Sequence, residues 1–155
     1  MIPNDRKIYG RFVGQPISAH DLLFDLPVKN KRRLRTLRRE IEVCGGEAVS
    51  DRDDFPETIY ILQSGKAELS FTNQLNDKVY RREIEKEEII GLRRLILHAA
   101  GQKKVTALSR CQFVTFPARE FYEVLQHDAI LGYRLLEILS LEITKNYRDF
   151  AAARF

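Results

Sequence analysis

Short runs of apolar residues, many of them alternating with polar ones, occupy the middle of the chain. Turn-forming pairs separate several of them, namely Gly45-Gly46, Ser64-Gly65 and Asn76-Asp77. The runs read IEVC, IYIL, AELSF, VYRREIE and EEII, and further on KVTAL and QFVTF. Short runs bounded by turn residues are typical of antiparallel strands that bury one face. We therefore expect closely spaced strands that form a small β-roll or sandwich.

Helical spacing of apolar residues marks the two ends of this strand region. Helical signals begin at Asp21, and Leu34, Leu37 and Ile41 recur at helical spacing in the segment that follows. A further short helix is expected for LRRLILHAA, directly after Gly91. The strands are therefore expected to be flanked by helices.

The C-terminal part carries a long amphipathic pattern. Pro117 opens a helical region, AREFYEVLQ, and the run AILGYRLLEILSLEITKNYRDF follows it. Asn146 interrupts a stripe of apolar residues at coiled-coil spacing: Leu136, Leu139, Ile143 and Phe150. This stripe predicts a homodimer through the C-terminal helix. The alternative is that the helix folds back on its own roll, because Leu135 and Ile138 offer a second apolar face.

The chain divides into three expected parts. Residues 1–20 are expected to form an irregular N-terminal arm, because they show no sustained period and contain Pro3, Gly10, Gly14 and Pro16. Residues 21–127 are expected to form the roll domain, and residues 128–155 the C-terminal dimerisation helix.

Composition narrows the class of protein. The 155 residues are 44% hydrophobic and 31% charged, which is typical of one globular domain. No apolar run reaches the roughly 20 residues that span a bilayer, and the N-terminus lacks a secretory signal, so we expect a cytoplasmic protein. Cys44 and Cys111 are too few for a multi-cysteine metal site, and we expect both to be buried as small apolar residues.

Positive charge is concentrated in residues 29–39. This stretch contains seven basic residues and no acid: Lys29, Lys31, Arg32, Arg33, Arg35, Arg38 and Arg39. We predict a helix with a basic surface made of Lys31, Arg32, Arg35, Arg38 and Arg39. A solvated face is the simplest interpretation, and nucleic acid, an anionic membrane or an acidic protein are the alternatives. Without base-reading residues, DNA binding is not supported by this chain alone.

Catalytic and metal-binding patterns are not found in the sequence. The histidines, His20, His98 and His127, do not fall at the i, i+4 spacing of a metal site. Ser64-Gly65 lacks the flanking pattern of a hydrolase elbow, and no phosphate-binding Gly-rich loop is present. We therefore expect no enzyme and no metal. His98 would be the sole candidate for a haem ligand.

The order of the elements resembles a known family over roughly residues 22–150. LLFDLP followed by a helix is similar to the opening of the cyclic-nucleotide-binding domain of the catabolite activator protein and fumarate-nitrate regulator family. CGGEAVSDRDDFPETIYILQSGKAEL resembles its Gly-Glu strand, acidic turn and Ser-Gly hairpin. EEIIGL resembles the approach to its phosphate-binding cassette, and VTALSRCQFVTFPAREFYEVL the strands and helix after it. The resemblance implies an antiparallel β-roll of the double-stranded β-helix, jelly-roll-like type, mainly β with flanking helices, followed by a long dimerisation helix.

The resemblance also assigns a candidate ligand site, and there the chain departs from the family. Gly91 is present, but Leu92 stands where the family has a Glu that holds the ribose hydroxyl. Gly101-Gln102-Lys103-Lys104 stands where an Arg would neutralise the phosphate. Arg93 and Arg94 nevertheless begin the following helix. The candidate ligand-binding residues are Gly91, Leu92, Arg93, Arg94, Lys103, Lys104, Asn146 and Tyr147.

Together these patterns predict a regulatory sensor module with a degenerate cassette that is not an ordinary cyclic AMP binder. No cofactor is firmly implied, although a nucleotide or another small anion is a candidate ligand. Two alternatives stay open. One is a ligand-free dimerisation or protein-docking module, with a regulatory protein as partner. The other is the sensory half of a transcription regulator whose helix-turn-helix is absent from this chain.

Overall fold

Two antiparallel sheets form the body of the protein. The computed structural model describes residues 18–23, 26–72, 78–92, 103–126 and 133. The four-stranded sheet has the order β1 (Arg39–Val43), β7 (Cys111–Pro117), β2 (Thr58–Ser64) and β5 (Ile89–Ile90). The three-stranded sheet has the order β4 (Val79–Glu83), β3 (Ala67–Thr72) and β6 (Lys103–Ala107). The expectation of a mainly antiparallel β fold with helices is confirmed, whereas the expected C-terminal helix lies outside the described residues.

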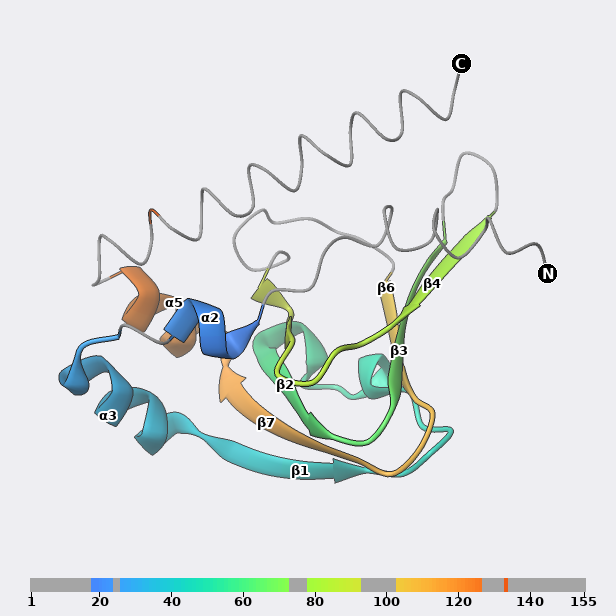
Figure 1. Ribbon diagram of the computed structural model, residues 1–155, viewed down its shortest axis with the longest axis horizontal. Helices are drawn as coiled ribbons and strands as arrows, with labels where there is room; N and C mark the ends of the chain where they lie inside the picture. Colours follow the sequence, from blue (N-terminus) through green and yellow to red (C-terminus); the bar gives the residue numbers. More distant parts are fainter. Residues whose placement is uncertain (1–17, 24–25, 73–77, 93–102, 127–132, 134–155) are drawn as a thin grey trace, which may run out of the picture.

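Short helices complete the described part of the chain. Helices α2 (Ala19–Leu23), α3 (Val28–Leu37) and α5 (Ala118–Gln126) gather at one end, beside the ends of β7 and β1 (Figure 1). Two 3-10 turns, η1 (Val49–Asp51) and η2 (Phe55–Glu57), lie between β1 and β2 in the sequence. Among the described residues, no helix is long and apolar enough to cross a membrane.

The central strand β2 is buried on both faces. Ile59 and Ile61 belong to the cluster that packs with the helices, here named the helix-side cluster, whereas Tyr60 and Leu62 belong to the roll cluster. Other members of the helix-side cluster are Ala19, Leu26, Leu34, Ile89, Leu92, Val114, Phe116, Ala118, Phe121, Val124 and Leu125. Other members of the roll cluster are Val43, Val49, Phe55, Ala67, Leu69, Tyr80, Ile84, Ile90, Val105, Ala107, Cys111 and Phe113. Because side chains of a strand alternate between its faces, one strand serves two cores.

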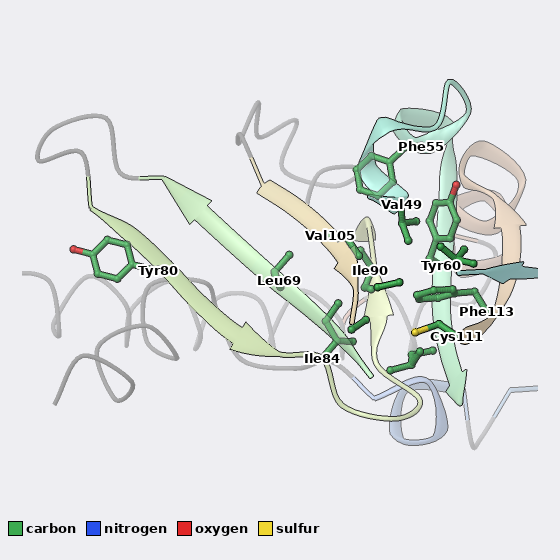
Figure 2. Packing of buried hydrophobic residues seen from close by; sticks show 14 residues of the cluster. Val49, Phe55, Tyr60, Leu69, Tyr80, Ile84, Ile90, Val105, Cys111 and Phe113 are labelled. Atoms are coloured by element: carbon green, nitrogen blue, oxygen red, sulfur yellow. The ribbon is translucent and has the colours of Figure 1, made fainter. Parts of the chain in front are cut away.

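Aromatic side chains fill part of the roll cluster (Figure 2). The ring of Tyr60 stacks on Phe55 with centroids 5.5 Å apart and meets the edge of Phe113 at 5.9 Å. The Tyr60 hydroxyl donates a hydrogen bond of 3.0 Å to Asp54 Oδ1, which Arg52 also contacts. Burial, followed by this bond to the Asp54 carboxylate, raises the pKa of Tyr60 to about 12.

The segment at Ser64-Gly65 is a corner between the two sheets, so the expected hairpin is wrong. β2 pairs with β7 and β5, whereas β3 pairs with β4 and β6. Gly65 has a φ of +93°, and a Cβ at this position would collide with the carbonyl oxygen of Arg110 and lie 2.8 Å from the Cα of Cys111. Glycine therefore permits both the backbone conformation and the close approach of two chain segments.

The basic helix ends earlier than its apolar spacing predicted. α3 ends at Leu37, because Arg38 has the extended backbone angles of φ −63° and ψ 135°. Arg39 and Ile41 lie in β1, where Ile41 is paired with Phe113 of β7. The prediction of Arg39 on a helical surface is therefore wrong, and long-range strand pairing explains the change.

The two cysteines differ in exposure. Cys111 is buried, as expected, and its Sγ donates to the Lys66 carbonyl oxygen at 3.1 Å. Burial raises the pKa of the Cys111 thiol. Cys44 is exposed where β1 leads into the Gly45-Gly46 turn, so the expectation of a buried Cys44 is wrong.

Candidate functional site

The approach to the cassette is a glycine turn at the end of β5. Gly91 has a φ of +102°, a conformation that residues with a Cβ rarely adopt. The glycine therefore allows the chain to turn sharply from the sheet toward Leu92, which begins the next segment.

The turn before β5 is fixed by backbone hydrogen bonds to two other elements. The Glu87 amide donates to the Leu62 carbonyl oxygen of β2 at 2.8 Å, and the Ala19 amide of α2 donates to the Glu87 carbonyl oxygen at 2.7 Å. Ser18 forms an antiparallel bridge with Glu88. Ser18 and Ala19, which were expected in the irregular arm, thus contact the roll. Glu87 has a φ of +69°, so the turn holds a non-glycine residue in a left-handed conformation.

A buried ion pair supports the same turn. Arg82 Nη1 donates to Glu88 Oε1 and Arg82 Nη2 to Glu88 Oε2, both at 2.8 Å. The Glu85 amide donates to Glu88 Oε1 at 3.0 Å. The side chain of Glu88 is 2% exposed and that of Arg82 is 11% exposed. This two-point pairing joins β4 to the residue that precedes β5 and so positions the approach to Gly91.

Leu92 packs on the helix side of the sheet. It is 1% exposed and belongs to the helix-side cluster, together with Ile89, Phe116 and Phe121. An aliphatic side chain cannot accept a hydrogen bond from a ribose hydroxyl. Leu92 therefore holds the start of the cassette against the helices, and it belongs to a different cluster from the side chains of the roll interior.

The alternation of β6 separates the two candidate lysines. Val105 and Ala107 are buried in the roll cluster, and Lys103, two residues before Val105, lies on the same side of the strand. Lys104 lies on the opposite side and is exposed. Of the two, Lys103 is the one positioned toward the roll interior. The alternating apolar residues Val105 and Ala107 already indicate this side of the strand.

The remaining residues of the predicted site lie outside the described residues. These are Arg93, Arg94, Asn146 and Tyr147, together with the predicted dimer interface at Leu136, Leu139, Ile143 and Phe150. Within the described ranges, no group of three or more His, Cys, Asp or Glu side chains could hold a metal ion.

The predicted basic surface is only partly available. Lys31, Arg32 and Arg35 are exposed on α3. Arg38 Nη1 pairs with Glu40 at 2.8 Å, and Arg39 Nη1 donates to the carbonyl oxygens of Thr36 and Arg38. The structure therefore places the last two cations in local contacts at the end of α3.

Sequence reasoning missed the Arg82–Glu88 pair. The two residues are six positions apart across a turn, which matches neither the helical nor the strand period. A signal was present in the sequence, because Glu88 directly precedes the apolar pair Ile89-Ile90 and an acid in such a position needs a partner if it is buried.

Comparison with known proteins gives the following similarities. The family model described as cyclic nucleotide-binding domain matches residues 40–128. A search of curated proteins gives no match. The sensor domain of the transcriptional regulator DNR from Pseudomonas aeruginosa is 19% identical with a TM-score of 0.65, and the match covers 79% of this chain and 87% of that one.

Two solved kinase regulatory proteins are also similar in fold. The regulatory domain of Toxoplasma gondii PKA with cAMP is 14% identical, with a TM-score of 0.66 and coverage of 88% of this chain and 50% of that chain. The regulatory subunit of a cAMP-independent protein kinase A from Trypanosoma brucei is 17% identical, with a TM-score of 0.67 and coverage of 98% and 52%. The fold is thus shared by a domain solved with cAMP and by the regulatory subunit of a cAMP-independent kinase, so the fold alone does not determine the ligand.

Proposed function

Because the chain belongs to the cyclic nucleotide-binding domain family, we propose that it is a regulatory sensor module, not an enzyme, whose cassette does not bind cyclic AMP in the ordinary way. The family match supports the regulatory role. The departures of the cassette from the family pattern support the second part of the proposal. Any ligand is then a nucleotide or another small anion that uses different contacts.

The observation that carries this proposal is the burial of Leu92. The residue after the cassette glycine contributes an aliphatic side chain, 1% exposed, to the helix-side cluster. Leu92 offers no acceptor to a ribose hydroxyl, and a hydroxyl left buried without a partner costs about 1 to 3 kcal/mol. The missing Arg removes a charge-assisted, two-point contact to the phosphate, which a lysine does not reproduce.

Calorimetric titration tests the proposal. Titration of the full chain with cyclic AMP and with cyclic GMP should give dissociation constants no tighter than the high-micromolar range. A micromolar constant corresponds to about 8 kcal/mol of binding free energy. A sub-micromolar affinity for cyclic AMP would overturn the proposal.

The two lysines of β6 provide a matched pair of variants. If the cassette holds an anion, Lys103→Gln should weaken binding of inorganic phosphate or a nucleotide, because Lys103 lies on the inner side of β6. Lys104→Gln removes the same charge from the exposed side and should leave binding unchanged. Equal effects of the two changes would show that the cation acts through general charge instead of a pocket.

A ligand-free docking module is the second candidate, and the same burial of Leu92 favours it. A module of this kind would show no heat of binding with any of these anions. We further propose that the protein forms a homodimer through Leu136, Leu139, Ile143 and Phe150, on the basis of their spacing in the sequence.

Light scattering tests the dimer. Leu139→Glu/Ile143→Glu should give a folded monomer, because carboxylates buried in a helix pair are costly while the roll has its own core. A wild type that is monomeric at tens of micromolar would refute the dimer. Circular dichroism of the variant reports whether the roll stays folded, and an unfolded variant would show that the helix serves the core.

A further inference from the structure

Helix α3 carries a group of cations without partners on its outer face. Lys29, Lys31, Arg32 and Arg35 are exposed, and their side chains make no hydrogen bond or ion pair with other described residues. Leu34 is buried, and it turns the opposite face of the helix toward the core. Arg33 differs, because its Nη2 lies 3.1 Å from Glu123 Oε2 of α5. These four residues are named the α3 cation face.

Folding itself concentrates this charge. The buried Leu34 and the Arg33–Glu123 contact orient the helix on the domain, and the four cations remain exposed to solvent. No acidic residue occurs in Val28–Leu37, so the helix offers none of its own carboxylates to neutralise them. In the sequence alone a solvated helix explained the charges. The structure adds that all four are exposed to solvent and are distinct from Arg38 and Arg39, whose guanidinium groups are already engaged.

We infer that the α3 cation face is a docking surface for the phosphate backbone of a nucleic-acid duplex, bound without regard to base sequence. The four cations span six residue steps, which is about 9 Å of helix. A DNA duplex presents one charge per about 1.7 Å counted over both strands, or one per about 3.4 Å along one strand, and the cations of α3 are on average about 3 Å apart along the helix axis. The charge density of the helix therefore matches that of one strand of the duplex.

Other partners match this face less well. An extended acidic peptide turns alternate side chains away, so it presents a carboxylate only about every 6 to 7 Å on one side. A membrane-binding helix inserts an apolar face, and a protein interface is centred on buried aromatic or aliphatic anchors. The described large apolar residue on the outside of α3 is Val28, 71% exposed, which is too little for either. Thr36 directs its hydroxyl to the Arg32 carbonyl oxygen, so it is not available to contact a base.

Salt dependence gives the inference a quantitative form. The logarithm of the binding constant falls with the logarithm of salt concentration with a slope of about 0.9 per neutralised phosphate, so four contacts give a slope of about 3.6. Raising salt from about 50 to 200 mM should therefore weaken binding about a hundredfold. Because only phosphates are contacted, duplexes of different sequence should bind equally.

Fluorescence anisotropy of a labelled 20-base-pair duplex titrated with the full chain measures this salt dependence. No nucleotide is added, so that the result is independent of the cassette. Lys31→Gln/Arg32→Gln/Arg35→Gln should lower the slope to about 0.9, since one contact remains. The control Lys66→Gln/Lys86→Gln/Arg110→Gln removes the same charge from the β2–β3 corner, the turn before β5 and the start of β7. Both variants change the net charge from +4 to +1, by loss of three. The control should keep the wild-type slope.

Arg32→Lys/Arg35→Lys keeps the charge and should also keep the slope, which separates lost charge from a disturbed helix. Equal slopes for the two triple variants, or a wild-type affinity that does not depend on salt, would overturn the inference. Tighter binding to phosphatidylserine vesicles or to polyglutamate than to the duplex, at the same salt concentration, would overturn it in favour of a membrane or an acidic protein.

Discussion

Replacing Arg82 by Met should strongly destabilise the protein. The change leaves the Glu88 carboxylate, 2% exposed, with one hydrogen bond from the Glu85 amide and without its cation. Breaking a buried pair in this way costs about 3 to 5 kcal/mol, because the remaining charge is desolvated and unpaired. Since a small domain is stable by about 5 to 15 kcal/mol, the loss is a large fraction of the total.

The exposures of the two partners predict an asymmetry. Glu88→Gln leaves Arg82, which is 11% exposed and so retains some access to water, and the amide oxygen of the new Gln can still accept a bond. This variant should lose about 1 to 3 kcal/mol. The double variant Arg82→Met/Glu88→Leu removes both charges and should recover most of the stability, because an apolar pair of similar volume often equals a buried ion pair.

Urea unfolding followed by circular dichroism measures all three variants. With the usual dependence of stability on urea, Arg82→Met should lower the midpoint by on the order of 2 M. Losses below about 1 kcal/mol for both single variants would refute the reasoning, since that is the range of solvent-screened surface pairs. A double variant no more stable than Arg82→Met would also contradict it, because the lost stability would then come from packing.

Three further changes test other features. In the wild type, burial raises the pKa of Tyr60 to about 12. About 2 to 3 kcal/mol of stability, present below pH 10, is therefore lost as the pH rises from about 10 to 12. Tyr60→Phe should remove this pH dependence of the free energy of unfolding. Gly65→Ala should lower the free energy of unfolding by on the order of 3 kcal/mol, because the added Cβ meets Arg110 and Cys111. Gly46→Ala, whose Cβ meets nothing within 4 Å, should lower it by about 1 kcal/mol. Equal losses of stability for the two variants would rule out the collision. Glu87→Gly should stabilise by about 0.5 to 1 kcal/mol by relieving the left-handed backbone, measured by thermal unfolding, and a loss of stability would contradict this.

Local sequence patterns predicted most of the strands but not their partners. Alternation identified β4 and β7, because each buries one face or both between turn residues. The Ser64-Gly65 corner has the composition of a hairpin, and only the pairing of β3 with β6 shows that the chain changes sheets there. The same applies to Ile41, whose helical spacing from Leu37 is overridden by its pairing with Phe113. Contacts between residues so far apart in the chain leave no local period to detect.

The candidate site was predictable to a different degree at each position. The family resemblance identified Gly91 as the cassette glycine, and its positive φ is a conformation that glycine adopts readily. The positions of Val105 and Ala107 were enough to distinguish Lys103 from Lys104, although the sequence reasoning did not use them. The burial of Glu88 and its pairing with Arg82 required the three-dimensional placement of two strands and a turn.

The two-sided burial of β2 makes the helices and the roll one cooperative unit. Ile59 and Ile61 lie under the helices while Tyr60 and Leu62 lie in the roll, on the same stretch of backbone. Separation of the helices from the sheet would expose one face of the strand on which the roll depends. The amide protons of β2 should therefore exchange with solvent only when the whole domain opens, at the same free energy as global unfolding. If α5 moves in regulation, it must then slide over Ile59 and Ile61 with the strand still covered.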